Sequence, residues 1–372
     1  MKSGFALVVL SLFASLYADE APAPAAHAPV MRKCPLQPPS HCSNVTFEVF
    51  GNWLYLQPNG SDLYYAAEAF PYDTSIAQPA VSPNWKIFEV QPGFHSAFEV
   101  GINFLLPYND MNIELNWERF RAHDVTSMKV TPLSVGTGNM VGPIYDIGPN
   151  SAHYKQARGS VHFDFDEVNL FVGKSICAFK DFTLRLYLGA SFAAIDQKMK
   201  AHYANSDAQT ARQIESISSY WGIGPQMGLD LYYQMVRDFY LTGNSVISLY
   251  MGRIRNHTTF KSDSPDLAAV GVAEPNVQRT RVPNRTQVIP GFEERLGFAY
   301  MHGYKKWQLN FEIGYLFQIY LNAVQSVDML TQALPNFAPG DLPTMGVFAV
   351  TFNRTLSNFI LSGPYASLKL DF

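Results

Sequence analysis

The chain has 372 residues and a formal net charge of −4 at pH 7. It therefore lacks the basic excess that marks nucleic-acid-binding proteins, and we expect no nucleic acid among its partners. Charged residues make up 16% of the chain and aromatic residues 14%, whereas soluble domains carry about 25% charged residues. Beyond the N-terminus, no segment approaches the run of about 18 apolar residues that a membrane-spanning helix needs, so none is predicted.

Residues 1–18 have the pattern of a secretory signal peptide. Lys2 supplies the positive charge, residues 5–13 form a short apolar run, and cleavage is expected after Ala18. The apolar run is too short to cross a bilayer as a helix. A secreted chain without a spanning helix is either soluble or a β-barrel. The low charge and the many aromatic residues favour the barrel, because its outer face is apolar and is bordered by aromatic girdles.

Residues 19–43 are rich in alanine and proline. This composition builds no core and predicts an extended or disordered periplasmic leader. Cys34 and Cys42 form a candidate disulfide, because the periplasm is oxidising. Cys177 is the third cysteine and is expected in a short turn, so one thiol is left over. The alternative is that none of the three cysteines is bonded.

From residue 44 onward, apolar and polar residues alternate in segments separated by short and long connections. Such alternation predicts β-strands, whereas an amphipathic helix would need spacings of three and four. The clearest alternating segments are 97–105, 113–118, 167–172, 183–192, 226–233, 293–300 and 307–321, and weaker ones are 46–56, 244–253 and 345–354. Short turns are expected near 106–111, 174–182, 235–242 and 302–305, and long loops near 58–86, 123–158, 195–217, 254–288 and 322–360.

The chain ends on an alternating strand. Ala366, Leu368, Leu370 and Phe372 share one face, with polar residues between them. A strand that closes on a terminal aromatic residue is typical of outer-membrane β-barrels, where one strand face meets lipid and the other a wet lumen. We therefore predict an all-β fold over 44–372: a transmembrane antiparallel up-and-down β-barrel of about 10–12 strands, with long extracellular loops and short periplasmic turns. Phe372 is the candidate assembly signal.

Three stretches carry a further pattern. WLYLQP at 53–58 precedes DLYYA at 62–66, QPGFH at 91–95 leads to LPYND at 106–110, and WGIGPQMGLD occupies 221–230. In this order they resemble the Legionella-type major outer-membrane protein family, to which major outer-membrane proteins of environmental chlamydiae are also similar. The resemblance covers most of 44–372. It implies an abundant surface protein, integral to the bacterial outer membrane, that forms a porin-like pore.

The chain departs from the family's pattern at two of these places. His95 stands where the family tends to have arginine, and Met111 and Asn112 stand where it has Trp-Asp. These differences affect the assignment of individual pore residues more than the fold.

Ten charged residues on the polar strand faces are the candidate pore lining: Glu99, Glu114, Glu118, Glu167, Arg185, Asp230, Glu293, Arg295, Glu312 and Lys369. Acidic residues outnumber basic ones in this set, which predicts a mild preference for cations. The alternative is that these side chains only solvate a narrow interior, since any small barrel with a wet lumen needs polar walls.

The sequence thus predicts an outer-membrane porin-like channel for passive diffusion of ions and small hydrophilic solutes. The alternative is a surface adhesin or structural envelope protein with a closed lumen. The chain has no HExxH pair, Cys/His ligand cluster or GxSxG motif, so we expect no enzymatic activity and no catalytic, metal or cofactor site. Expected partners are outer-membrane lipid and lipopolysaccharide, the outer-membrane assembly machinery, and other copies of the chain.

Overall fold

The computed structural model describes residues 46–60, 62–69, 85–106, 111–129, 140–142, 155–179, 181–206, 209–236, 238–262, 276–303, 307–336 and 344–372. The predicted signal peptide and leader, with Cys34 and Cys42, lie outside the described residues. Within the described segments, no helix is long and apolar enough to cross a membrane.

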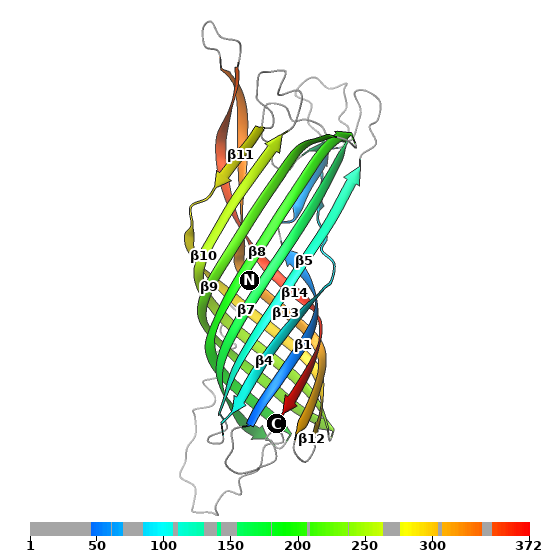
Figure 1. Cartoon of the computed structure of the whole chain (residues 1–372), viewed down its shortest axis with the longest axis vertical. Coiled ribbons are helices and arrows are strands. Elements are labelled where there is room, and N and C mark those ends of the chain that lie inside the picture. The colour runs from blue at the N-terminus through cyan, green and yellow to red at the C-terminus, as the bar shows by residue number, and fades with distance from the viewer. Residues whose placement is uncertain are drawn as a thin grey trace, which may run out of the picture. The chain divides into compact units, whose positions relative to one another are not determined.

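Ten long antiparallel strands of the described chain close into a barrel. They are β1 (Thr46–Gly60), β4 (His95–Leu105), β5 (Met111–Lys129), β7 (Gln156–Phe179), β8 (Phe182–Ser206), β9 (Gln209–Val236), β10 (Phe239–Ser262), β12 (Arg285–Gly303), β13 (Gln308–Asn336) and β14 (Thr344–Asp371). Each pairs with the next of these strands along the chain, and β14 pairs with β1 to close the ring. Figure 1 shows β1 (blue) beside β14 (red) where the chain ends. The predicted all-β barrel is confirmed, at the lower end of the expected strand number.

The two ends of the barrel differ in their connections. At the end where β1 begins and β14 ends, short connections join neighbouring strands, and we call this the turn end. The opposite end is called the loop end. Its connections are longer and include 61–94, 130–155 and 263–284, although β8 and β9 are separated there only by 207–208.

The loop end carries four further strands. They are β2 (Tyr64–Ala69), β3 (Trp85–Glu89), β6 (Met140–Gly142) and β11 (Asn276–Arg281). β11 pairs with β10, whereas β2, β3 and β6 form a separate small sheet. Tyr65 and Ala66 of β2 are buried in the same apolar cluster as Leu54 and Phe163 of the barrel strands. The hydroxyl of Tyr203 also donates to the Tyr65 carbonyl, so the β2 segment packs into the barrel interior.

Alternation sorts the strand side chains into an apolar outer face and an interior face. On β4, Phe98 and Val100 are 41% and 44% exposed, while Glu99 between them is 4% exposed. Ile313 and Tyr315 on β13 are exposed in the same way. The face assignment made from the sequence is therefore confirmed on these strands, and the outer face suits a hydrocarbon environment.

Several predicted loops are strands instead. The segment 195–217 falls almost wholly within β8 and β9, and most of 322–360 belongs to β13 and β14. The segment 345–354 is part of β14 rather than a separate strand, and Cys177 lies in β7 rather than in a turn. Beyond the apolar outer face, no strand face needs to meet lipid. The alternation is reversed there: Ile195 and Tyr203 are buried while Asp196 is exposed. These extensions therefore lack the apolar outer face that marks membrane strands in the sequence.

The interior toward the loop end is apolar. Ten inward leucine, isoleucine and phenylalanine side chains from seven strands have no water-accessible surface: Leu54, Leu56, Phe120, Phe163, Phe165, Ile254, Ile289, Leu316, Phe359 and Leu361. We call these ten residues the apolar plug. The ring centroid of Phe165 lies 5.7 Å from that of Phe359 and 5.3 Å from that of Tyr320. Leu316 and Tyr320 both occupy inward positions of β13. Leu316 is part of the plug, and Tyr320 packs against Phe165 of the plug.

Candidate functional site

The interior toward the turn end is polar and holds a cavity of about 170 Å³. Its walls carry seven carboxylates and three basic groups among the described residues. The cavity lies at the turn-end side of the apolar plug. Eight of the ten charged residues predicted from the sequence line this cavity, whereas Glu118 and Glu167 do not.

Three glutamates form a row on neighbouring strands at the plug side of this cavity. Glu99 on β4 lies directly opposite Glu118 on β5, and Glu118 lies directly opposite Glu167 on β7. All three occupy inward positions because strand side chains alternate with a period of two. They are 4%, 2% and 1% exposed. Like charges directly opposite each other destabilise a sheet, so this row requires compensation from elsewhere in the interior.

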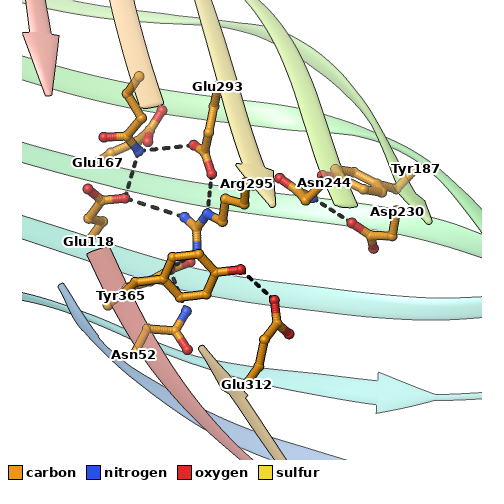
Figure 2. A network of polar contacts seen from close by, with 12 residues as sticks. Asn52, Glu118, Glu167, Tyr187, Asp230, Asn244, Glu293, Arg295, Glu312 and Tyr365 are labelled. Carbon is orange, nitrogen blue, oxygen red and sulfur yellow. Dashed lines mark hydrogen bonds and ion pairs between the residues drawn. The ribbon is translucent and has the colours of Figure 1, made fainter. Parts of the chain in front are cut away.

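Arg295 on β12 supplies the positive charge from across the interior. Its Nη1 lies 2.7 Å from Glu99 Oε2, and its Nη2 lies 3.7 Å from Glu118 Oε2. Its Nε lies 2.6 Å from Glu293 Oε1 on the same strand. Figure 2 shows Arg295 between Glu118 and Glu293. One guanidinium thus serves three carboxylates in what we call the central group: Glu99, Glu118, Glu167, Glu293 and Arg295.

Neutral donors complete the hydrogen bonding of this central group. Gln318 Nε2 donates to Glu118 Oε2 and to Glu293 Oε2, both at 3.0 Å. Glu167 accepts from the hydroxyls of Tyr320, at 3.2 Å, and of Tyr250. These bonds tie β5 and β7 to β10, β12 and β13 through the interior.

A second group surrounds Arg185 on β8. Arg185 Nη2 lies 2.6 Å from Glu114 Oε2, and Nη1 lies 2.8 Å from Asp230 Oδ2. Asn244 Nδ2 donates to Asp230 Oδ1 at 2.5 Å and to the Tyr187 hydroxyl at 2.7 Å (Figure 2). Two carboxylates again share one guanidinium.

The two remaining lining candidates are Glu312 and Lys369. Glu312 accepts from the hydroxyls of Tyr365, at 2.5 Å, and of Thr242, at 3.0 Å. Lys369 lines the cavity, with its Nζ 5.9 Å from the ring centroid of Phe50. All ten predicted residues therefore face the interior. That they line a conducting path stays a prediction.

Sequence reasoning missed the neutral partners of the glutamates. Gln318 and Tyr320 lie on the inward face of 307–321, and Tyr320 was visible only as an exception to the alternation. Tyr250 lies in a segment whose alternation is weak. The local sequence signal for these tyrosines was an aromatic residue at an inward strand position. That signal does not tell which carboxylate the tyrosine hydroxyl contacts.

Comparison with solved structures gives distant matches. The outer membrane protease OmpT of Escherichia coli is 12% identical, with 88% of this chain and 96% of that chain covered and a TM-score of 0.38. A Pseudomonas aeruginosa FadL homologue is 8% identical, with 88% and 90% covered and a TM-score of 0.23. The toluene transporter TodX of Pseudomonas putida is 10% identical, with the same coverage and a TM-score of 0.26. Comparison with curated proteins gives no match.

One family comparison covers nearly the whole chain. The family described as Legionella pneumophila major outer membrane protein precursor matches residues 38–372. That range contains every strand of the barrel and both groups of interior charges. The chain therefore belongs to this major outer membrane protein family and is an integral β-barrel protein of the outer membrane.

Proposed function

We propose that this protein is a surface barrel of the outer membrane whose lumen is closed at rest, with an adhesive or structural role carried by its loop end. The observation that carries the proposal is the apolar plug, whose ten side chains have no water-accessible surface. Because seven strands contribute to the plug, no single side-chain rotation would open a continuous water path.

Barrel size supports the same proposal. A barrel of eight strands is just filled by its own side chains, and open aqueous channels are found in barrels of about 16–18 strands. With ten strands, this barrel is close to the filled case. The β2 segment adds further packing at the loop end, where Tyr203 donates to the Tyr65 carbonyl.

A second candidate is the diffusion channel for ions and small hydrophilic solutes. It is favoured by the polar cavity of about 170 Å³ and its charged walls, because a path for ions through the barrel needs a polar lining of this kind. In this candidate the apolar plug would have to rearrange before solutes could cross.

The outer face and the closing strand of the barrel suggest its partners in the membrane. We propose that lipid and lipopolysaccharide contact the apolar outer face and that the outer-membrane assembly machinery recognises the strand ending in Phe372. Association with other copies of the chain belongs to the same proposal, and we assign the protein no enzymatic activity.

Single-channel recording of the purified full-length protein in planar bilayers separates the two candidates. We expect no steady conductance from the unmodified protein. The double variant Phe163→Ala and Phe359→Ala, whose rings are 5.9 Å apart in the plug, should introduce one. Leu170→Ala, on the outer face, is the matched control and should stay silent. A stable conductance of the unmodified protein at low voltage would overturn the closed lumen and favour the channel.

A further inference from the structure

The central group holds more negative than positive charge. It has four glutamates and one guanidinium, that of Arg295, which contacts three of them. Arg185 is engaged with Glu114 and Asp230 in the second group. An ionised carboxylate that is removed from water needs a partner, because burying an unpaired charge is strongly unfavourable. The central group therefore has room for additional positive charge.

The carboxylates of Glu118, Glu167 and Glu293 converge on one point. Oxygen atoms of all three lie within 4.8 Å of one another. Oxygen ligands lie about 2.3–2.6 Å from Ca²⁺, so two ligands of one calcium ion are at most about 5 Å apart. Mg²⁺ usually keeps several waters and binds through one or two carboxylates, whereas Ca²⁺ accepts several carboxylate and amide oxygens. Three converging carboxylates therefore suit Ca²⁺ better than Mg²⁺.

Unpartnered oxygens beside these carboxylates are a second, independent observation at this place. Asn116 and Asn169 lie directly opposite each other on β5 and β7, two residues along the same strands from Glu118 and Glu167. They are only 7% and 6% exposed and line the cavity. Their Oδ1 atoms, and Oε1 of Glu118, have no hydrogen-bond partner among the described residues. Such oxygens can only accept hydrogen bonds or bind a cation and its waters.

Gln318 adds a further oxygen to this set. Its Nε2 lies between Glu118 and Glu293, while its Oε1 has no partner among the described residues and the side chain has no exposed surface. A half-turn of the amide exchanges the nitrogen for the oxygen. The same position then offers a ligand to a cation instead of donors to two carboxylates.

We propose that Glu118, Glu167 and Glu293 bind one calcium-sized divalent cation at the plug side of the polar cavity. The amide oxygens of Asn116 and Asn169 bind it directly or through water, and the ion enters from the turn end through the cavity. Bound there, the cation joins β5 and β7 to β12 across the interior and neutralises the glutamate row. This site is independent of whether the barrel conducts.

Terbium luminescence tests the site on the full-length folded protein in detergent after treatment with a chelator. Tb³⁺ takes the oxygen ligands of Ca²⁺ and luminesces when a neighbouring tyrosine is excited, and the hydroxyl of Tyr250 is hydrogen-bonded to Glu167. We expect saturable luminescence that Ca²⁺ displaces more readily than Mg²⁺. Ca²⁺ should also raise the thermal unfolding midpoint, because it binds the folded barrel alone.

Two ligand variants and one control make the test specific. Glu293→Gln and Glu167→Gln should each weaken Tb³⁺ and Ca²⁺ binding by more than about tenfold, since even an outer-shell change costs that much. Glu312→Gln removes an interior carboxylate outside the central group and should leave the affinity unchanged. Glu293 is the more exposed of the two ligands, so its variant carries the test if Glu167→Gln does not fold.

Two results would overturn the proposal. One is equal Tb³⁺ affinity in the unmodified protein and both ligand variants. The other is a barrel that acid stabilises but Ca²⁺ does not, which would mean that protons rather than a metal ion neutralise the glutamate row.

Discussion

Glu118 on β5 and Glu167 on β7 lie directly opposite each other in the strand register, and both are almost completely buried. Nothing in their own strands relieves the repulsion between them. Relief for Glu118 comes from Arg295 and Gln318 across the interior, and Glu167 accepts from Tyr320. The pair therefore connects opposite walls of the barrel through its interior.

Loss of Arg295 should destabilise the barrel severely. Its guanidinium contacts Glu99, Glu118 and Glu293, and removing one partner of a buried ion pair typically costs about 3–5 kcal/mol. We expect Arg295→Ala to lower the free energy of unfolding by that order, measured by urea unfolding monitored through tryptophan fluorescence. The control is Arg121→Ala, whose exposed pair with Asp164 at 3.1 Å should contribute at most about 1 kcal/mol. Equal losses in the two variants would contradict a structural role for the central group.

The depth of the outer face can be tested with arginine. Ile313 lies on the outer face of β13 and is 51% exposed. Near the bilayer midplane a lipid-facing arginine costs about 2–4 kcal/mol, and near the interface about 0–1 kcal/mol. We expect Ile313→Arg to show the larger loss and Leu309→Arg, toward the turn end of the same strand, the smaller one. Unfolding in lipid vesicles measures both, and the reverse order would mean that the apolar belt is placed wrongly.

Deletion of Phe372 should reduce assembly. Its ring stacks on that of Phe47 with centroids 5.2 Å apart, and its backbone N–H donates to the Phe47 carbonyl at 3.1 Å. Without it, the pairing that closes β14 on β1 loses its last contacts. We expect less heat-modifiable folded protein in the membrane at unchanged precursor levels. Phe372→Tyr keeps the ring and should assemble normally. Unchanged folded protein after the deletion would refute the assembly role.

Acid should weaken one ion pair at the loop end. Burial alone would raise the pKa of Glu215, but the hydrogen bond from Lys198 and the charges of Lys198 and Lys200 outweigh it, so the pKa is lowered. The Lys198 Nζ lies 2.5 Å from Glu215 Oε1, on strand extensions beyond the outer face. A group with a lowered folded-state pKa stabilises the fold above its unfolded pKa and loses that contribution as pH falls through the folded value.

The matching experiment compares Glu215→Gln with the unmodified protein at two pH values. At pH about 7 the variant should lose up to about 1 kcal/mol, because the pair is partly exposed and screened. At pH about 3, below the usual pKa of a glutamate, the loss should shrink. Urea midpoints measure both, and the same loss at the two pH values would show that packing rather than charge explains it.

The sequence by itself determined which side chains face inward. Alternation is a local property, because neighbouring side chains of a strand point to opposite faces. Glu99, Glu118 and Arg295 could therefore be assigned to the interior from their immediate neighbours alone. The same reasoning identified the closing strand that ends in Phe372. It failed where strands run beyond the lipid, as over 195–217, because the pattern is reversed there: apolar residues such as Ile195 and Tyr203 face inward and polar residues face outward.

Only the tertiary structure decided which inward side chains meet. Arg295 and Glu99 are 196 residues apart and yet hydrogen-bonded. The division of the interior into an apolar plug and a polar cavity was likewise not visible in any one strand. Contacts across a barrel depend on strand number and on the stagger of every strand pair around the ring. A shift by a single residue in one pair would turn Glu118 from the interior to lipid, so these contacts are fixed jointly by all ten strands.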